Sequence, residues 1–385
     1  MAGVVKLKEG KERKVLRGYP WIQRGECQAR GVEDGAVANL VTAGGDFLAV
    51  GTYNSRSRFR FRVLSLQDET IDAAWFAQRF QRAKDLRSDL GFGTEACRVL
   101  YSEADGVPGL IVDRYGPNLV VQVRSLGQER LKDIWLEPLI EVFGAESAVE
   151  RSEMAGRQEE GLEPYQGVLH GSPPEYAEIV EDGLAYSVPL MGGLKTGHYL
   201  DQRRTRNLFG AMVRPKEKVL DAFCYTGGFA MQAARSGASV TALDILPEAL
   251  DLARKNLATN GLQAQTIEAN AFEWLQQTQG AGFDWIVLDP PAIAKTGAKR
   301  DSLKWAIWKL VHASLPNLSP GGRLIVCNCS YQLSLHETIE TCRLAAGDRG
   351  RRLVLERTTM QDTDHPAPIH FPEALYLKCA WLRSD

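Results

Sequence analysis

The stretch 321-GGRLIVCNCSYQ-332 places Cys327 and Cys329 two residues apart, at the end of an apolar run that is typical of a strand. A disulfide between them is disfavoured, because residues i and i+2 of an extended segment have Cα atoms about 6.5–7 Å apart, at the edge of bridging range. A zinc site would need further ligands, and the sequence has no second cysteine pair or His-x-x-x-His at a suitable spacing. Two buried cysteines acting as small hydrophobes remain possible, so the residues around the pair must decide its role.

Polar residues also end other apolar runs in this half of the chain. Asp221 ends the first run, and the turn 221-DAFCYTGGFA-230 lets a ligand approach the backbone, but it lacks the G-x-G-x-x-G that holds a pyrophosphate. Asp221 could receive a cationic group such as an ammonium. Asp244, twenty-three residues later, has the spacing of a ribose-hydroxyl acceptor. A nucleoside that carries an ammonium but no pyrophosphate describes S-adenosylmethionine, which we expect as the cofactor.

Two further strand ends complete the predicted pocket. Asn270, in 269-ANAF-272, could face the adenine, and the prolines of 289-DPPA-292 make a stiff floor at the pocket mouth. Enzymes that methylate exocyclic amines usually have an aromatic residue after such prolines, whereas Ala292 and Ile293 follow here. This departure disfavours amine methylation.

Cys329 is expected beside the methyl donor, where its thiol could act as a nucleophile. Cytosine C5 is a poor nucleophile, and a thiolate that adds to C6 turns the ring into an enamine able to attack a methyl sulfonium. We therefore expect Cys329 to be the nucleophile. Cys327, two residues deeper in the apolar run, is expected in the core, and Cys224 is expected at most to pack against the cofactor.

The pattern of elements that must position these residues predicts an α/β fold. From about residue 185, strands alternate with helices, which is typical of a doubly wound, Rossmann-like domain with its ligands at the carboxyl ends of the strands. Short strands fill residues 1–66, and a helix is expected at about 70–90, with Leu86 and Leu90 on its apolar stripe and Gly91 at its end. TIEANAF (266–272), FDWIVLD and RLIVCNC are expected as strands. The predicted domains are 1–66 (all-β), 67–184 (α+β) and 185–385.

Composition and charge favour a cytoplasmic protein that binds nucleic acid. The 385-residue chain has seven scattered cysteines, no apolar signal segment at its start and no run of eighteen apolar residues, so neither a disulfide framework nor a membrane span is expected. Residues 1–30 hold eight Lys and Arg against three Glu, despite a net charge of −2. In 56-RSRFRFRV-63, read as a strand, one face carries a possible phosphate-binding stripe or an ordinary solvated face, made of Arg56, Arg58, Arg60 and Arg62.

Nearly the whole chain resembles a known family, the class I methyltransferases with an N-terminal PUA domain that make 5-methylcytosine in 23S ribosomal RNA. The resemblance rests on RGYPWIQRGE, GTYNSRSRFRFRVLS, EADGVPGLIVDRYG, ERSEMAGRQEEGLEP, GLKTGHYLDQRRTR, DAFCYTGGFA, EANAF, DPPAIAK, NCSYQ and DHPAPIHFPEALYLK, which occur in order. It implies a small PUA domain, a central α+β domain and a methyltransferase domain that uses S-adenosylmethionine. It also implies cofactor contacts from Tyr199, Gln202, Asp221, Tyr225, Thr226, Gly227, Asp244, Asn270, Ala271 and Asp289.

The family's Ser-Cys-Ser motif matches NCS at 328–330, which assigns the nucleophile to Cys329. The chain departs from the family at His198 and at Ile293, and DPPA offers no second cysteine, so the base that removes the C5 proton stays open, with Asp289 as one candidate. His365 is expected to fix a loop rather than to catalyse. Two alternatives remain: an RNA 5-methyluridine methyltransferase, whose usual Cys-Asn-Pro begins like Cys327-Asn328, and a non-catalytic RNA-binding protein. The target nucleotide, the assembly stage of the substrate and the choice between monomer and homodimer stay open.

Overall fold

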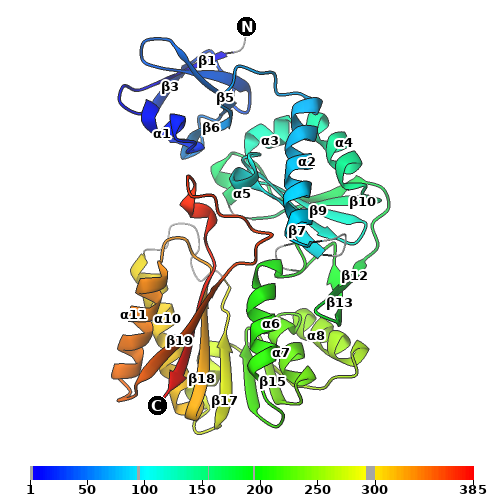
Figure 1. Cartoon of the computed structure of the whole chain (residues 1–385), viewed down its shortest axis with the longest axis vertical. Helices are drawn as coiled ribbons and strands as arrows, with labels where there is room; N and C mark the ends of the chain where they lie inside the picture. The colour runs from blue at the N-terminus through cyan, green and yellow to red at the C-terminus, as the bar shows by residue number, and fades with distance from the viewer. Residues whose placement is uncertain (1–2, 93–95, 155, 194–195, 292–299) are drawn as a thin grey trace. The chain divides into compact units, whose positions relative to one another are not determined.

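The structure, a computed structural model, describes residues 3–92, 96–154, 156–193, 196–291 and 300–385 (Figure 1). The chain forms two compact units. Unit 1 comprises Met1–Ala177, Val188–Gly197 and Thr363–Ala374, and unit 2 comprises Glu178–Ser187, His198–Asp362 and Leu375–Asp385. The chain therefore passes between the units several times, and the division into domains at 66 and 184 remains a prediction.

The N-terminal part of unit 1 is a six-stranded sheet of order β2-β6-β5-β4-β1-β3. Its inward side chains, such as Val5, Leu40 and Phe61, are fully buried in one core. The elements are β1 (Gly3–Leu7), α1 (Glu12–Leu16), β2 (Trp21–Gln23), β3 (Cys27–Arg30), β4 (Val37–Val41), β5 (Phe47–Tyr53) and β6 (Phe59–Ser65).

The rest of unit 1 is built on a five-stranded sheet of order β11-β10-β9-β8-β7, against which the helix α2 packs. Asp72 caps α2 by accepting from Trp75 N at 2.9 Å. The expected helix at 70–90 is present, but Leu86 and Leu90 are exposed, and Arg87 occupies the buried face instead. The elements are α2 (Ala73–Asp89), β7 (Ala96–Tyr101), β8 (Leu110–Tyr115), β9 (Asn118–Val123), α3 (Leu126–Arg130), α4 (Lys132–Phe143), β10 (Ser147–Ser152), α5 (Gly156–Glu159) and β11 (Tyr165–His170).

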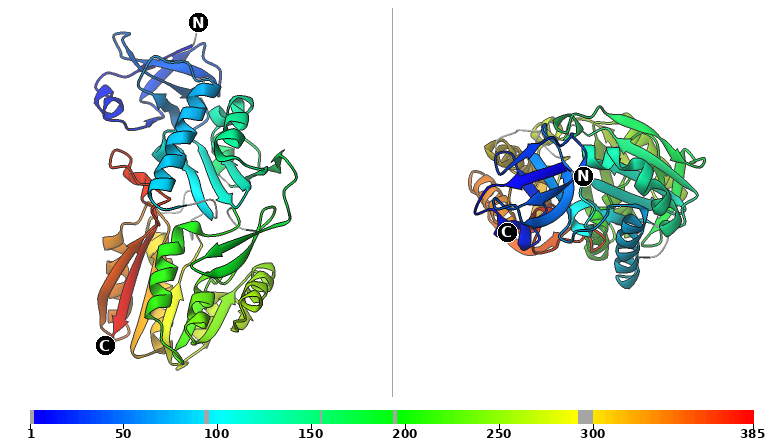
Figure 2. Two further views of the ribbon diagram at one scale, coloured as in Figure 1. Left: turned by 45° about the vertical axis from the view of Figure 1, so that its right-hand side comes forward. Right: turned by 90° about the horizontal axis from the view of Figure 1, so that it is seen from above.

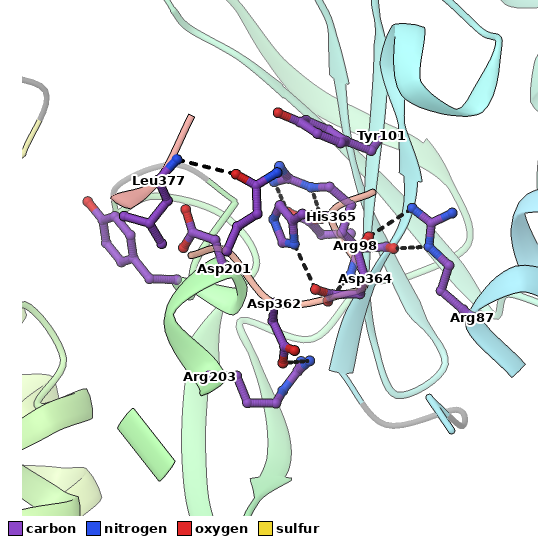
Figure 3. A network of polar contacts seen from close by, with 12 residues as sticks. Arg87, Arg98, Tyr101, Asp201, Arg203, Asp362, Asp364, His365 and Leu377 are labelled. Carbon is purple, nitrogen blue, oxygen red and sulfur yellow. Dashed lines mark hydrogen bonds and ion pairs between the residues drawn. The ribbon is translucent and has the colours of Figure 1, made fainter. Parts of the chain in front are cut away.

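The segment Thr363–Ala374 belongs to unit 1, and buried hydrogen bonds hold it there (Figure 3). Arg98 N donates to Asp364 Oδ2 at 2.9 Å, and Arg87 Nη2 donates to the Asp364 carbonyl at 2.8 Å. His365 Nδ1 lies 2.7 Å from Asp364 Oδ1, and both side chains are buried. Asp364 therefore ties the segment to the sheet, and the loop-fixing role of His365 stays a prediction.

Unit 2 contains a seven-stranded sheet of order β16-β15-β14-β17-β18-β20-β19. The first five strands are parallel, and β20 runs antiparallel to both β18 and β19. The strands are β14 (Lys218–Ala222), β15 (Ser239–Asp244), β16 (Gln265–Glu268), β17 (Phe283–Leu288), β18 (Leu318–Asn328), β19 (Leu353–Met360) and β20 (Lys378–Ser384), and the helices are α6 (Arg203–Met212), α7 (Gly228–Arg235), α8 (Pro247–Thr259), α9 (Ala271–Gln277), α10 (Arg300–Ser314) and α11 (Leu335–Gly347). A two-stranded sheet of β12 (Tyr176–Glu181) and β13 (Leu184–Pro189) precedes them.

Helices cover both faces of the seven-stranded sheet, which confirms the predicted doubly wound α/β fold. Side chains of successive residues in one strand point to opposite faces of the sheet. Leu324 of β18 packs with α10 and α11, whereas Ile325 packs with α6 and α7. Figures 1 and 2 show the green helices and the orange helix α11 on these opposite faces. Within the described ranges, no helix is long and apolar enough to cross a membrane.

Candidate active site

The chemistry-bearing residues of unit 2 meet at one edge of its sheet. Because β14, β15, β17 and β18 are parallel, their carboxyl ends bring Asp221, Asp244, Asp289 and Cys329 to the same edge. β20 is antiparallel, so its first residue, Lys378, lies at this edge too, opposite Asn328 of β18. The architecture thus gathers the predicted residues and adds a lysine.

The turn after β14 is held in an unusual backbone conformation. Phe223 and Tyr225 have φ of 70° and 48°, and Gly227 has φ of 88°. The N–H groups of Phe223 and Cys224 both donate to the Leu243 carbonyl at 2.9 Å, and Asn256 Nδ2 of α8 donates to the Thr226 carbonyl at 3.1 Å. The neighbouring strand and helix therefore fix the turn in a shape that most residues would adopt only at a cost.

Asp221 is fully buried, and within the described residues only one of its two carboxylate oxygens accepts a hydrogen bond. Its Oδ2 accepts from Ala230 N, near the start of α7, at 2.8 Å. Among the described residues, its Oδ1 has no hydrogen-bond partner. Burial raises the pKa of Asp221 to about 7, and the carboxylates of Asp289 and Asp244 add to this shift. A buried acceptor beside two other acids is suited to a cationic ligand.

Asp244 organises the turn and keeps acceptor capacity. Its Oδ2 accepts from Tyr225 N at 2.8 Å and its Oδ1 from Leu246 N at 3.0 Å. A carboxylate has about four acceptor sites, so two hydrogen bonds leave room for ligand hydroxyls.

The strand expected through residue 272 ends at Glu268, because Asn270 caps α9 instead. Asn270 Oδ1 accepts from Phe272 N at 2.9 Å, and its amide nitrogen can still donate to a ligand. Ala271, the first residue of α9, is buried. The strand expectation was wrong at its end, but Asn270 and Ala271 still lie at the ligand edge of the sheet.

Tyr199 and Asp289 lie close to each other at this edge of the sheet. Burial raises the pKa of the Tyr199 hydroxyl well above its ordinary value, and the charges of Asp289 and Cys329 add to the shift. The Tyr199 ring packs edge-on against Tyr225, with centroids 5.3 Å apart. Asp289 itself is half-buried, and Ala292 and Ile293, which follow it, lie outside the described residues.

Buried contacts position the segment that carries Tyr199 and Gln202. Arg206 Nη1 donates to the Tyr199 carbonyl at 2.8 Å, and Arg206 also pairs with buried Glu181. His198 lies 3.3 Å from Glu181 in the same network. Gln202 Oε1 accepts from Cys379 Sγ at 3.6 Å, and its buried Nε2 has no partner among the described residues. Sequence reasoning flagged His198 only as a family departure and missed this network.

The two cysteines of the opening motif differ in their surroundings. Cys327 is 1% exposed in the core, where burial raises the pKa of its thiol well above the usual range. Cys329 follows the last residue of β18 and is only partly buried. Cys224 is buried with a raised thiol pKa, again because of burial. Cys329 is therefore the more exposed of the two, whereas Cys327 is packed in the core.

Sequence reasoning missed Lys378 as a functional candidate. Its side chain is buried at 6% exposure, and Nζ donates to the Ser330 carbonyl at 2.5 Å, one residue beyond Cys329. Burial lowers the pKa of Lys378 to about 8, partly offset by the nearby thiols of Cys329 and Cys379. The available signal was a lone lysine at the start of the apolar strand 378-KCAWL-382.

The expected arginine stripe in unit 1 is only partly present. β6 begins at Phe59, so exposed Arg56 and Arg58 precede the strand, and half-buried Arg60 lies within it. Arg62 is buried: its guanidinium pairs with Glu103 at 3.0 Å and with Glu160 at 2.8 Å. The stripe prediction was wrong for Arg62, whose charge is already used inside the protein.

Two family models match separate parts of the chain. Residues 5–66 match a PUA-like domain, and residues 200–354 match a methyltransferase small domain. Curated relatives match over almost the full length. The ribosomal RNA large subunit methyltransferase I of Shewanella denitrificans and that of Vibrio parahaemolyticus are each 36% identical to this chain over 98% of both chains.

Solved structures match at lower identity. The methyltransferase SMU.776 complexed with SAH aligns with a TM-score of 0.86 at 22% identity, covering 99% of both chains. A SAM-dependent methyltransferase from Streptococcus mutans aligns with a TM-score of 0.85 at 21% identity and the same coverage. At this identity, the likeness supports the fold of the whole chain.

Proposed function

Because this chain belongs to the ribosomal RNA large subunit methyltransferase I family, and is thus an enzyme that methylates ribosomal RNA, we propose that its target is C5 of a cytosine in 23S ribosomal RNA. The observation that carries the proposal is the position of Cys329. This partly exposed thiol follows β18, at the edge where three carboxylates gather. A nucleophile beside a cation-binding pocket suits methylation of a carbon that must first be activated.

Cys329 acts by covalent addition. Its thiolate forms a bond to C6, and the displaced electrons make C5 nucleophilic. S-adenosylmethionine, when bound, supplies an electrophilic methyl group. After C5 is methylated, its proton leaves to a base and the sulfur–C6 bond breaks, which restores the free enzyme. We assign the base to Asp289, which is half-buried at the adjacent strand end.

The residues of the pocket fit S-adenosylmethionine. The unsatisfied Asp221 Oδ1 and Gln202 Nε2 offer a buried acceptor and a buried donor, and Asp244 retains lone pairs for the ribose hydroxyls. Asn270 can donate to the adenine. The proposed cofactor contacts are Tyr199, Gln202, Asp221, Tyr225, Thr226, Gly227, Asp244, Asn270, Ala271 and Asp289.

The proposal is tested by analysing the modified nucleoside. The purified full-length chain is incubated with unmodified 23S ribosomal RNA and S-adenosylmethionine, and the RNA is then digested and separated by mass spectrometry. We expect 5-methylcytosine. Formation of 5-methyluridine instead would establish the alternative uridine activity, and no methylated product from a folded protein would favour a non-catalytic RNA-binding role. Fragment mapping then locates the nucleotide.

Affinity for S-adenosylmethionine should rise with pH up to about pH 7. The pKa of Asp221 is about 7 in the free protein, and a cation at its carboxylate lowers that pKa, so binding below pH 7 must release a proton. If the bound carboxylate is ionised throughout, affinity increases about fivefold from pH 6 to pH 7. Calorimetry on the wild type and on Asp221→Asn measures the effect. The variant should lose this pH dependence, and equal slopes would contradict the assignment.

We further propose that residues 1–66 bind RNA away from the reaction, through Arg56, Arg58 and Arg60. The support is a PUA-like domain with exposed arginines before β6. The combined change Arg58→Ala and Arg60→Ala should weaken RNA binding and reduce its salt slope by roughly 0.7–0.9 for each phosphate that is no longer neutralised. Filter binding at several salt concentrations measures this.

A matched control removes two other surface charges, Arg254→Ala with Arg343→Ala, whose side chains are 51% and 67% exposed. This control should leave the slope unchanged if RNA binds through the first domain. If the wild type and the Arg58→Ala, Arg60→Ala variant show the same salt slope of RNA binding, these arginines form an ordinary solvated face.

We also propose a cytoplasmic location, which the seven free cysteines support.

A further inference from the structure

Within the described part of the chain, no carboxylate pairs with the buried side chain of Lys378. Its side chain is 6% exposed, and the ion pairs and hydrogen bonds of the described residues give it the Ser330 carbonyl but no carboxylate. Buried ammonium groups are costly unless a negative charge compensates them. The groups near Lys378 that can become negative are the thiols of Cys329 and Cys379.

A hydrogen bond fixes the end of the Lys378 side chain. Lys378 is paired with Asn328 across the β18–β20 ladder, and Cys329 is the next residue along the chain from Asn328. The 2.5 Å hydrogen bond to the Ser330 carbonyl then holds Nζ against the backbone that follows Cys329. Side chains alternate along a strand, so Lys378 leaves the ladder on the face of Asn328 and Cys329 packs toward the other face. The bond to the Ser330 carbonyl nevertheless brings Nζ back to the strand end, where Cys329 is a neighbouring ionisable group.

The two neighbouring thiols differ in what they can do. Cys379 is 0% exposed and donates to Gln202 Oε1, so it cannot reach a substrate. Cys329 is partly exposed at the sheet edge. Of the two thiols near the Lys378 ammonium group, that of Cys329 is therefore the one able to react with a substrate.

We propose that Lys378 is a positioning residue whose ammonium group stabilises the thiolate of Cys329, the form that adds to the substrate base. The inference rests on the proposed function and deepens it. In this step the sulfur–hydrogen bond of Cys329 breaks and its proton passes to solvent, while Lys378 stays protonated. The thiolate electron pair then forms the bond to C6. Among the described residues, the other ionisable groups near the pair are Cys379 of β20, Tyr199 before α6 and Asp289 after β17.

The test measures thiolate formation without RNA or methyl transfer. Full-length wild type, Lys378→Met and Lys378→Arg are treated with iodoacetamide between pH 6 and pH 10, and the rate is followed for each cysteine peptide by mass spectrometry. Lys378→Met removes the charge at similar length, whereas Lys378→Arg keeps it. Cys27, which is partly buried in unit 1, is the internal control.

We expect Lys378→Met to raise the pH midpoint of Cys329 alkylation by about one unit and to lower its rate at pH 7 about tenfold. Lys378→Arg should restore most of the rate, and the Cys27 profile should not move. An unchanged Cys329 midpoint in a variant with wild-type thermal unfolding and S-adenosylhomocysteine binding would overturn the inference. Lys378→Gln gives the same comparison if Lys378→Met does not fold.

The alkylation test of Lys378 and the test of the proposed methylation reaction can fail independently. If 5-methylcytosine is not the product, the alkylation profile still decides whether Lys378 acts on Cys329. If the profile is unchanged while Cys329 is trapped by RNA, the lysine assignment fails and the nucleophile stands.

Discussion

Cys329→Ala should lower methylation of ribosomal RNA by on the order of 10³-fold or more, while S-adenosylmethionine still binds. The thiol lies at the same sheet edge as Asp221 and Asp244, and in the proposed mechanism Cys329 is the residue that bonds to C6. Removing it leaves the pocket carboxylates of Asp221 and Asp244 in place. Single-turnover methylation assays and calorimetry, run on the same preparation, separate loss of chemistry from loss of cofactor binding.

Cys327→Ala is the matched control for this prediction. The side chain is 1% exposed within the core, so the change removes buried volume but no reactive group. We expect a modest loss of stability and retained methylation. If a folded Cys327→Ala protein loses activity while Cys329→Ala keeps it, Cys327 is the nucleophile and the assignment to Cys329 is wrong.

Arg62→Ala should destabilise the first sheet of unit 1 by about 3–5 kcal/mol, because it leaves two buried carboxylates without their counter-ion. Burial alone would raise the pKa of Glu160, but the charge of Arg62 and the hydrogen bonds from Ser57 and Asn54 lower it below the usual range. Hydrogen exchange of the β5 and β6 peptides, followed by mass spectrometry across a denaturant series, measures the opening free energy.

Arg58→Ala is the comparison for Arg62→Ala. The Arg58 side chain is 57% exposed and lies 3.9 Å from Glu159, which is also exposed, so its loss should cost less than about 1 kcal/mol. Similar opening free energies for the two variants would mean that Arg62 is not the structural ion pair that its contacts indicate.

The sequence predicted the architecture of unit 2 well because each strand carries its own local signal. Apolar runs such as 283-FDWIVL-288 became the strands, and Gly227 and Pro247 lie where a turn and a helix start require them. The family, the fold class and S-adenosylmethionine as cofactor are confirmed. The positions of Asp221 and Asp244 followed from the rule that parallel strands end at one edge.

The sequence could not predict charges that are buried by distant partners. Arg62 looked like part of an exposed stripe, but Glu160 lies 98 residues away in the chain. Leu86 and Leu90 were assigned to the apolar face of α2, whereas Arg87 is buried there by its ion pair with Asp105. Lys378 donates a hydrogen bond to the Ser330 carbonyl, 48 residues away in the chain. Local periodicity contains no information on such pairs, because each depends on tertiary structure.

The most direct test of the account is covalent trapping with RNA that contains 5-fluorocytosine. In the proposed mechanism, addition of Cys329 to C6 forms an RNA–protein bond that breaks only when the C5 proton leaves. A fluorine at C5 takes the place of that proton, so the bond should persist. With S-adenosylmethionine present, the account predicts a complex that survives denaturing electrophoresis and whose modified peptide contains Cys329. A complex through Cys327, or trapping by 5-fluorouracil RNA and not by the cytosine analogue, would contradict it.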